Sequence, residues 1–290
     1  MTAPPVFGRR DIGTIKETKF TPAPRPDRQP PASKRQKPLD LGGRPPVFLL
    51  IGGNGSGKTT WARWAIDRAL AAGATPALAA LDRGDRLLAR FFDNVAMPSQ
   101  DAPELEGAAF VADFLAFVAE HRIPAVLDFG GGGDLYLKAA LADDPGLIDA
   151  VVGADMAVIE VLFLAPRQQD IQLLVDMEAT GIKPTATILV MNESMIERGT
   201  SFDDAFRGIL TNQDFKAAVA RGAYVVRVPR LFPQALALEI EDKFFRFSQA
   251  GAGVSADPEV TPIRGLDRSR VNRWLADMEA AHEAVRAALP

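Results

Sequence analysis

Short apolar runs alternate along the chain with longer segments in which apolar side chains recur every three or four residues. The short runs hold few charges, which is typical of strands that are buried on both faces of a sheet. We expect strands over residues 47–51, 74–81, 123–127, 157–164, 185–191 and 223–228. The longer segments predict helices over residues 60–70, 86–92, 104–122, 135–153, 168–179, 213–221 and 233–247.

This alternation predicts an α/β fold with a doubly wound, mostly parallel sheet that helices cover on both faces. In such sheets, ligands bind at the carboxyl ends of the strands. The polar residues that directly follow the predicted strands are therefore the first candidates for a functional site.

The loop after the first predicted strand fits the pattern G-x-x-x-x-G-K-[ST] of the P-loop NTPases. It consists of Gly52, Gly53, Asn54, Gly55, Ser56, Gly57, Lys58, Thr59 and Thr60. Glycines allow backbone N–H groups to surround phosphate groups where a side chain would block the approach, and the N-terminus of the following helix attracts anions. The alternative is a chance glycine turn, which the strand before the loop and the helix after it disfavour.

Two residues of this loop and one distant aspartate predict a nucleotide and magnesium site. Lys58 is expected to reach the β- and γ-phosphates, and the hydroxyl of Thr59 to ligate Mg²⁺. Asp128 directly follows the third predicted strand, where a carboxylate can hold the ion through water. The alternative for Asp128 is an ordinary loop aspartate at a strand end.

Asp82 and Asp85 follow the second predicted strand in the same way. Either carboxylate could orient an attacking water, ligate the metal through water, or accept a proton from a phosphoryl acceptor. Helix N-capping is an equally weighted alternative for both. The candidate catalytic residues are thus Lys58, Asp82, Asp85 and Asp128.

Charge and proline are concentrated at the N-terminus. Residues 1–46 contain ten Lys or Arg and four acidic residues, so this stretch carries +6 and the rest −10 of the net charge of −4. Ten of the 22 prolines also lie there. Such a stretch cannot bury enough apolar surface to offset its ordering entropy, which predicts a disordered, basic, proline-rich arm. The arm either contacts DNA, RNA or a partner protein, or it is a solubilising tail.

After the arm we expect an NTPase domain over residues 47–248, a linker over 249–263 and a C-terminal helix over 264–290. The helix either packs against the domain or is solvated, and its basic residues could touch a partner. These are Arg264, Arg268, Arg270 and Arg273.

Other protein classes are disfavoured. The chain has no cysteine, which excludes disulfides and thiolate chemistry. Its two histidines, His121 and His282, have no cysteine cluster beside them, which argues against zinc sites and triad hydrolases. The absence of a membrane-spanning apolar run and of a recognisable signal peptide leads us to expect a cytoplasmic protein.

The sequence resembles the ParA/MinD group of P-loop ATPases over about residues 45–248. The resemblance rests on the phosphate loop, the aspartate after the second strand, Asp128-Phe129-Gly130-Gly131, and the stretches 151–166, 188–192 and 226–231. Within the group it is most similar to plasmid stability and conjugal-transfer relatives (StbB- or TraL-like). The resemblance implies that Asn192 and the loop after Pro229 hold the adenine, and that the protein switches between nucleotide states, often by dimerising over ATP. The group's signature lysine, which reaches across the dimer to the partner's phosphates, falls on Gly53 here.

The favoured function is an ATP-binding, Mg²⁺-dependent nucleotide switch in plasmid partition or stability, or in conjugative DNA transfer, with weak hydrolysis because Gly53 replaces that lysine. Its expected partners are ATP or ADP, DNA or a DNA-bound protein at the basic arm, and a second copy in a homodimer. The alternative is a small-molecule kinase in which Asp82 or Asp85 is the base and Arg83, Arg86 or Arg167 clamps the phosphoryl group. A third possibility is a protein that binds the nucleotide without turning it over.

Overall fold

The computed structural model describes residues 36–82, 87–99, 102–130, 132–167, 169–231, 234–254, 259–263 and 265–290. Residues 1–35, most of the predicted arm, lie outside this part. The chain divides into one unit over residues 1–34 and a second over 35–290, and only the second is described below.

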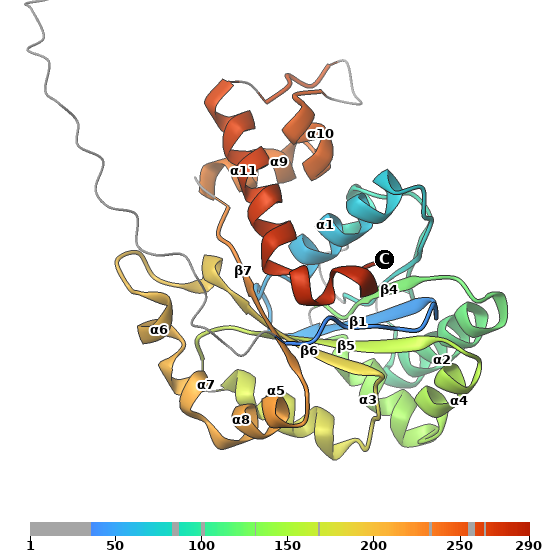
Figure 1. Cartoon of the computed structure of the whole chain (residues 1–290). Coiled ribbons are helices and arrows are strands. Elements are labelled where there is room, and N and C mark those ends of the chain that lie inside the picture. The colour runs from blue at the N-terminus through green and yellow to red at the C-terminus, as the bar shows by residue number, and fades with distance from the viewer. Residues whose placement is uncertain are drawn as a thin grey trace, which may run out of the picture. The chain divides into compact units, whose positions relative to one another are not determined.

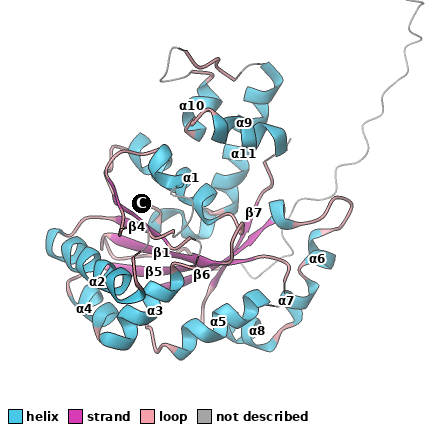
Figure 2. Cartoon of the chain, turned by 180° about the vertical axis from the view of Figure 1, so that it is seen from behind, coloured by secondary structure: helices cyan, strands magenta, loops and turns pink. Residues whose placement is uncertain are grey.

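The second unit is built on a seven-stranded sheet, shown in Figures 1 and 2, in which every described pair of neighbouring strands is parallel. Its order is β3-β2-β4-β1-β5-β6-β7. The strands are β1 (Pro46–Gly52), β2 (Ala77–Ala80), β3 (Val95–Ala96), β4 (Ala125–Asp128), β5 (Ala157–Leu164), β6 (Ala186–Asn192) and β7 (Tyr224–Val228). The predicted parallel α/β sheet is thus confirmed. The two-residue strand β3 was not predicted, and β2 is shorter than predicted because Pro76 has no N–H group to donate to the ladder.

Helices cover both faces of the sheet (Figures 1 and 2). On one face lie α1 (Lys58–Ala71), α9 (Gln234–Asp242), α10 (Phe247–Ala252) and α11 (Gly265–Ala281). On the other face lie α2 (Glu104–His121), α3 (Asp134–Asp143), α4 (Leu147–Gly153), α5 (Gln169–Ala179), α6 (Phe202–Ala205), α7 (Arg207–Thr211) and α8 (Gln213–Ala220). Strand β1 alternates between the two cores, with Phe48 and Leu50 in the first and Val47, Leu49 and Ile51 in the second.

Residues of the C-terminal region, such as Val271, Trp274 and Met278, pack into one core of this unit. Helix α10 occupies the start of the predicted linker, and the predicted C-terminal helix ends at Ala281 and is followed by the 3₁₀ helix η3 (Glu283–Ala288). The buried indole of Trp61 in α1 donates a hydrogen bond to Nε2 of buried His282 at 2.8 Å. Burial lowers the pKa of His282 to about 4, so the imidazole is a neutral acceptor at pH 7. The segment therefore braces the helix that follows the phosphate loop.

The last residues of the predicted arm also pack against this unit. The backbone N–H of Leu39 donates to the carbonyl of Ala284 at 2.8 Å, and Leu39 and Leu41 are both buried. Residues 36–45 are therefore part of the described unit. The burial of Leu39 and Leu41 stabilises the packing of this segment, although the average composition of residues 1–46 is polar.

None of the helices in the described ranges is both long enough and apolar enough to cross a membrane.

Candidate functional site

The phosphate loop joins β1 to α1 at the carboxyl edge of the sheet. Gly57 has a φ of +97°. A Cβ atom at Gly57 would lie 2.1 Å from Nδ2 of Asn192, and one at Gly52 would lie 2.8 Å from the Cβ of Phe163. Glycine is therefore required at both positions, by conformation at the first and by close packing at both. Between them, Gly53, Asn54 and Gly55 form an exposed tip, while Ser56 is buried.

Lys58 is the first residue of α1 and is only 4% exposed. Its Nζ donates to the carbonyl oxygens of Gly52 at 2.6 Å and Gly53 at 3.0 Å. Burial lowers the pKa of Lys58, while the nearby carboxylates of Asp128 and Asp82 raise it. The ammonium group is thus held directly beneath the loop, at the N-terminus of a helix, where an anion is favoured.

Thr59 and Asp128 are brought together by the topology of the sheet. Asp128 ends β4 and lies opposite Leu50 of the neighbouring strand β1, while Thr59 lies in the first turn of α1. The Thr59 hydroxyl donates to Oδ2 of Asp128 at 2.7 Å. Strand, glycine loop, helix and this neighbouring aspartate complete the arrangement. The fold is that of the P-loop NTPases.

The surroundings of Asp128 fit a magnesium ion. Its carboxyl is 4% exposed, and Oδ1 accepts no hydrogen bond from the residues that the structure describes. Burial raises the pKa of Asp128 to about 6, although the hydrogen bond from Thr59 and the charge of Lys58 lower it. The described residues hold no cluster of three or more acidic or histidine side chains that could cage a metal alone. A hydroxyl, one carboxylate and phosphate oxygens form the partial ligand set that Mg²⁺ accepts while keeping several waters.

Asp82 lies at the same edge of the sheet, beside the loop that follows β4. A Cβ atom at Gly130 would lie 2.4 Å from Oδ2 of Asp82, so the missing side chain of Gly130 makes room for this carboxylate. Asp82 also raises the pKa of Asp128 and Lys58, which places its charge near both. The other predicted base, Asp85, and the two arginines Arg83 and Arg86 lie outside the described residues.

Asn192 ends β6 and Pro229 directly follows β7, and in this structure each contacts protein groups. Nδ2 of Asn192 donates to the carbonyl of Ser56 in the phosphate loop at 3.0 Å, and its Oδ1 accepts from the backbone N–H and hydroxyl of Ser194. The carbonyl of Pro229 accepts from the indole of Trp274 in α11 at 2.9 Å. Asn192 thus braces the phosphate loop directly, and adenine binding by these two residues stays a prediction.

Asp170 is a residue at this site that the sequence analysis did not identify. It lies in α5, and its Oδ1 would be 3.7 Å from a Cβ atom at Gly53. Oδ2 accepts from the backbone N–H of Ala165 at 2.5 Å, and burial raises the pKa of the carboxyl. The carboxylate is therefore fixed beside the exposed tip of the loop. No signal in the sequence marks it, because the contact depends on how α5 follows β5.

No protein-family model matches this chain, and no curated protein does. The comparison with solved structures found partial similarities. FtsY from Mycoplasma mycoides is 21% identical over 51% of this chain and 52% of its own, with a TM-score of 0.36. Chloroplast FtsY from Physcomitrella patens is 17% identical over 82% of this chain and 67% of its own, with a TM-score of 0.40. A nucleotide-binding protein from Archaeoglobus fulgidus, solved with ADP, is 13% identical over 71% of this chain and 90% of its own, with a TM-score of 0.41. The chain thus spans about half the length of the first of these structures.

Proposed function

We propose that this protein binds ATP with Mg²⁺ and acts as a nucleotide switch in the cytoplasm. One observation carries the proposal: the Thr59 hydroxyl and the Asp128 carboxyl are hydrogen-bonded beside the buried Lys58, directly below a loop that admits no side chain at Gly52 or Gly57. A hydroxyl, a buried carboxylate and an ammonium group at a helix N-terminus together suit a phosphate chain and its cation.

Each side chain has a distinct role in this proposal. Lys58 would exchange the carbonyl oxygens of Gly52 and Gly53 for phosphate oxygens, which carry more negative charge. The Thr59 hydroxyl would turn from Asp128 to the ion, and Asp128 would hold a water of that ion. Mg²⁺, when bound, supplies positive charge to the phosphate oxygens.

We propose further that hydrolysis by the isolated protein is slow, below about one turnover per minute. Phosphoryl transfer needs positive charge near the γ-phosphate in the transition state, and one such cation is worth roughly 10³–10⁵ in rate. In the ParA/MinD group that the sequence resembles, the residue at the position of Gly53 is a lysine that supplies this charge. Here Gly53 has no side chain, and the nearest group to its position is the acidic Asp170. A partner could provide the missing cation.

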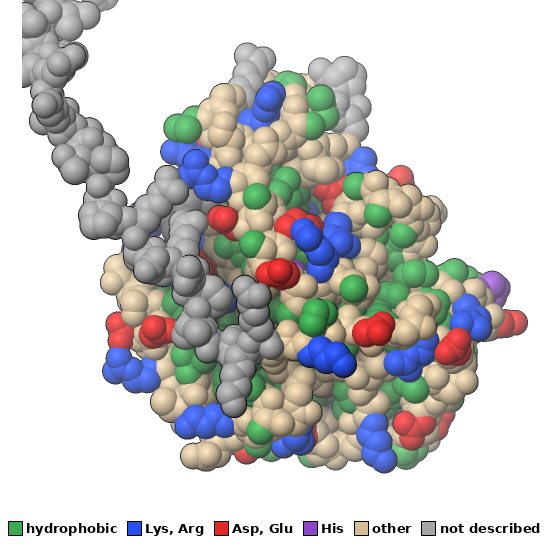
Figure 3. Space-filling model, viewed as in Figure 1, with side chains coloured by type: hydrophobic (Ala, Val, Ile, Leu, Met, Phe, Trp, Pro, Cys, Tyr) green, Lys and Arg blue, Asp and Glu red, His purple; other side chains and the backbone are tan. Residues whose placement is uncertain are grey.

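The biological setting that we propose is plasmid partition or stability, or conjugative DNA transfer, through a homodimer and a DNA or DNA-bound partner. The support is the resemblance at the phosphate loop, Asp128, Asn192 and Pro229. Basic and acidic side chains of the described residues are interspersed on the face shown in Figure 3. The basic residues of the predicted arm, residues 1–46, are the candidate contact for nucleic acid.

A small-molecule kinase is the second candidate, and one observation favours it. A cavity of about 390 Å³ lies at the carboxyl ends of β5 and β6, lined by Pro166, Arg167, Met195, Glu197, Thr200 and Ala205. Arg167 in such a cavity could orient a phosphoryl acceptor. A kinase would transfer the γ-phosphate to an added small molecule, whereas a switch would release only inorganic phosphate.

Sedimentation velocity with Mg²⁺ and either ATP or ADP tests the switch. We expect ATP to shift the full-length wild-type protein to a larger species, ADP to leave it unchanged, and Lys58→Ala to abolish the shift. An unchanged sedimentation coefficient at saturating ATP would contradict the switch and favour the kinase or a protein that only binds nucleotide.

A further inference from the structure

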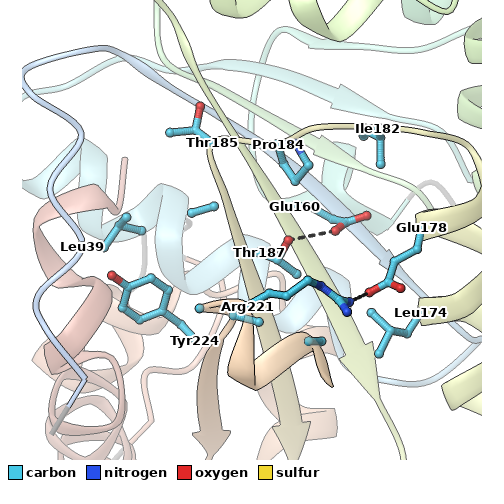
Figure 4. A pocket seen from close by; sticks show the side chains of 14 residues that line it. Leu39, Glu160, Leu174, Glu178, Ile182, Pro184, Thr185, Thr187, Arg221 and Tyr224 are labelled. Carbon is cyan, nitrogen blue, oxygen red and sulfur yellow. Dashed lines mark hydrogen bonds and ion pairs between the residues drawn. The ribbon is translucent and has the colours of Figure 1, made fainter. Parts of the chain in front are cut away.

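A second cavity lies away from the phosphate loop, near the amino ends of two strands. Figure 4 shows the side chains that line it. Thr185, Ala186 and Thr187 line it at the start of β6, and Tyr224 lines it at the start of β7, so it opens at the amino ends of these parallel strands. Its volume is about 660 Å³, within the usual range for small-molecule sites.

Glu160 is the unusual residue in this cavity. It lies within β5, among apolar residues, and is only 4% exposed. The Thr187 hydroxyl donates to its Oε2 at 3.2 Å, as Figure 4 shows. Its Oε1 has no hydrogen-bond partner among the residues that the structure describes, and the same holds for the buried hydroxyl of Thr185. Both residues line the cavity, and buried polar groups without partners reduce stability unless a ligand satisfies them.

The charges around the cavity select the sign of that ligand. Besides Glu160, the charged side chains that line it are Glu178 of α5 and Arg221 after α8, and these two form an ion pair with each other. Among the described residues of the lining, ionised Glu160 therefore has no cationic partner. Burial, together with the charge of Glu178, raises the pKa of Glu160 to about 7. A bound cation would reverse this effect, since an opposite charge favours the ionised carboxylate.

We propose that this cavity binds a small organic cation, whose ammonium or guanidinium group contacts Glu160 and Thr185 and whose apolar body packs against Leu174, Ile182 and Pro184. A guanidinium or ammonium group provides the N–H donors that both unpartnered oxygens need. A short alkyl chain matches the apolar part of the lining. An anion would meet two carboxylates, and a bare metal ion would find too few ligands.

Isothermal titration calorimetry of the full-length protein tests the proposal with n-butylguanidinium and n-butylammonium as probes and n-butylurea as the uncharged control. We expect saturable binding of the two cations at pH 8 and at least tenfold weaker binding of the urea. Glu160→Gln keeps the shape of the side chain and should weaken cation binding at least tenfold. Glu120→Gln removes the same charge from an exposed position on α2 and should leave binding unchanged.

Two further measurements separate this site from a merely structural glutamate. Thr185→Val removes the unpartnered hydroxyl without changing any charge, and should weaken binding about threefold. Because only the ionised carboxylate attracts the probe, affinity for the wild-type protein should fall about tenfold from pH 8 to pH 6. Glu160→Gln removes the titrating carboxyl and should abolish the pH dependence.

The proposal is overturned if neither cation binds at millimolar concentration, if n-butylurea binds as tightly as the cations, or if folded Glu160→Gln binds them like the wild type. If Glu160→Gln does not fold, the Thr185→Val and pH measurements decide. Normal affinity in Thr185→Val together with a flat pH profile would then overturn the proposal.

Discussion

The sheet contains two buried carboxyl groups in different surroundings. Asp128 ends β4 beside the phosphate loop, and Glu160 lies in the middle of β5 and lines the cavity at the amino ends of β6 and β7. Both are 4% exposed, and both accept a hydrogen bond from a threonine hydroxyl, at 2.7 Å in Asp128 and 3.2 Å in Glu160. Each has a second oxygen to which no described residue donates a hydrogen bond. Burial raises both pKa values, to about 6 and about 7.

The difference lies in the charges that surround each carboxyl. Asp128 has the ammonium group of Lys58, a helix N-terminus and a glycine loop beside it, which together suit an anion bridged by a metal ion. Among the described residues, the charged neighbour that affects the pKa of Glu160 is the acidic Glu178, and the cavity wall is partly apolar. An unpartnered carboxyl oxygen therefore indicates a different ligand at each site. The surrounding charges favour a metal-bound anion at Asp128 and an organic cation at Glu160.

The largest expected effect concerns the conformation of the phosphate loop. Gly57→Ala places a side chain at a positive φ and 2.1 Å from Nδ2 of Asn192. We expect ATP affinity to fall at least about a hundredfold, because the turn and the Asn192 brace must both change. Gly53→Ala is the matched control, since its nearest neighbour would be 3.7 Å away and its φ is not positive. Equal ATP affinity of the two variants by calorimetry would contradict a fixed loop.

The metal dependence of ATP binding sharpens the role of Asp128. Asp128→Ala should weaken Mg²⁺-ATP about 10–100-fold, the usual cost of losing a group that supports a metal ion. Metal-free ATP, titrated in EDTA, should lose much less, because Asp128 then has no ion to hold. Equal losses with and without Mg²⁺ would make Asp128 a structural residue.

A smaller effect concerns the contribution of Glu160 to the pH dependence of the protein's stability. The pKa of Glu160 is raised on folding from 4.5 to about 7, so the carboxyl stays protonated to a higher pH in the folded protein than in the unfolded chain. Its contribution is complete below the unfolded pKa and is lost as the pH rises through about 7. Relative to Glu160→Gln, the wild type should lose about 1.4 kcal/mol of unfolding free energy between pH 6 and pH 8. Parallel urea-unfolding curves for the two proteins over this range would show that Glu160 is not buried as described.

The sequence predicted most of the fold because its apolar runs are short, regularly spaced and separated by helical segments. It missed β3, which is too short to leave a pattern, and it placed α10 in a linker because Ala and Gly dominate that stretch. The brace between Trp61 and His282 joins residues far apart in the chain, and only the fold brings them together.

The candidate site shows the same limit. Lys58, Thr59 and Asp128 were predicted because a motif and a strand end place them without tertiary information. Asp170 has no comparable local signal, since its position depends on the packing of α5 beside the loop. The sequence analysis used Glu160 only as part of the ParA/MinD resemblance. One acidic residue in an apolar strand does not reveal a cavity, which α5, β6 and residues near β7 form together.

The central claim is that the phosphate loop and the cavity lined by Glu160 bind different ligands. Calorimetric titration of Mg²⁺-ATP into wild type, Lys58→Ala and Glu160→Gln tests this claim most directly. Lys58→Ala should bind at least tenfold more weakly, because a charge-assisted contact to phosphate is lost. Glu160→Gln should bind ATP as the wild type does, since the cavity that Glu160 lines includes no residue of the phosphate loop. Wild-type affinity in folded Lys58→Ala would contradict the central claim.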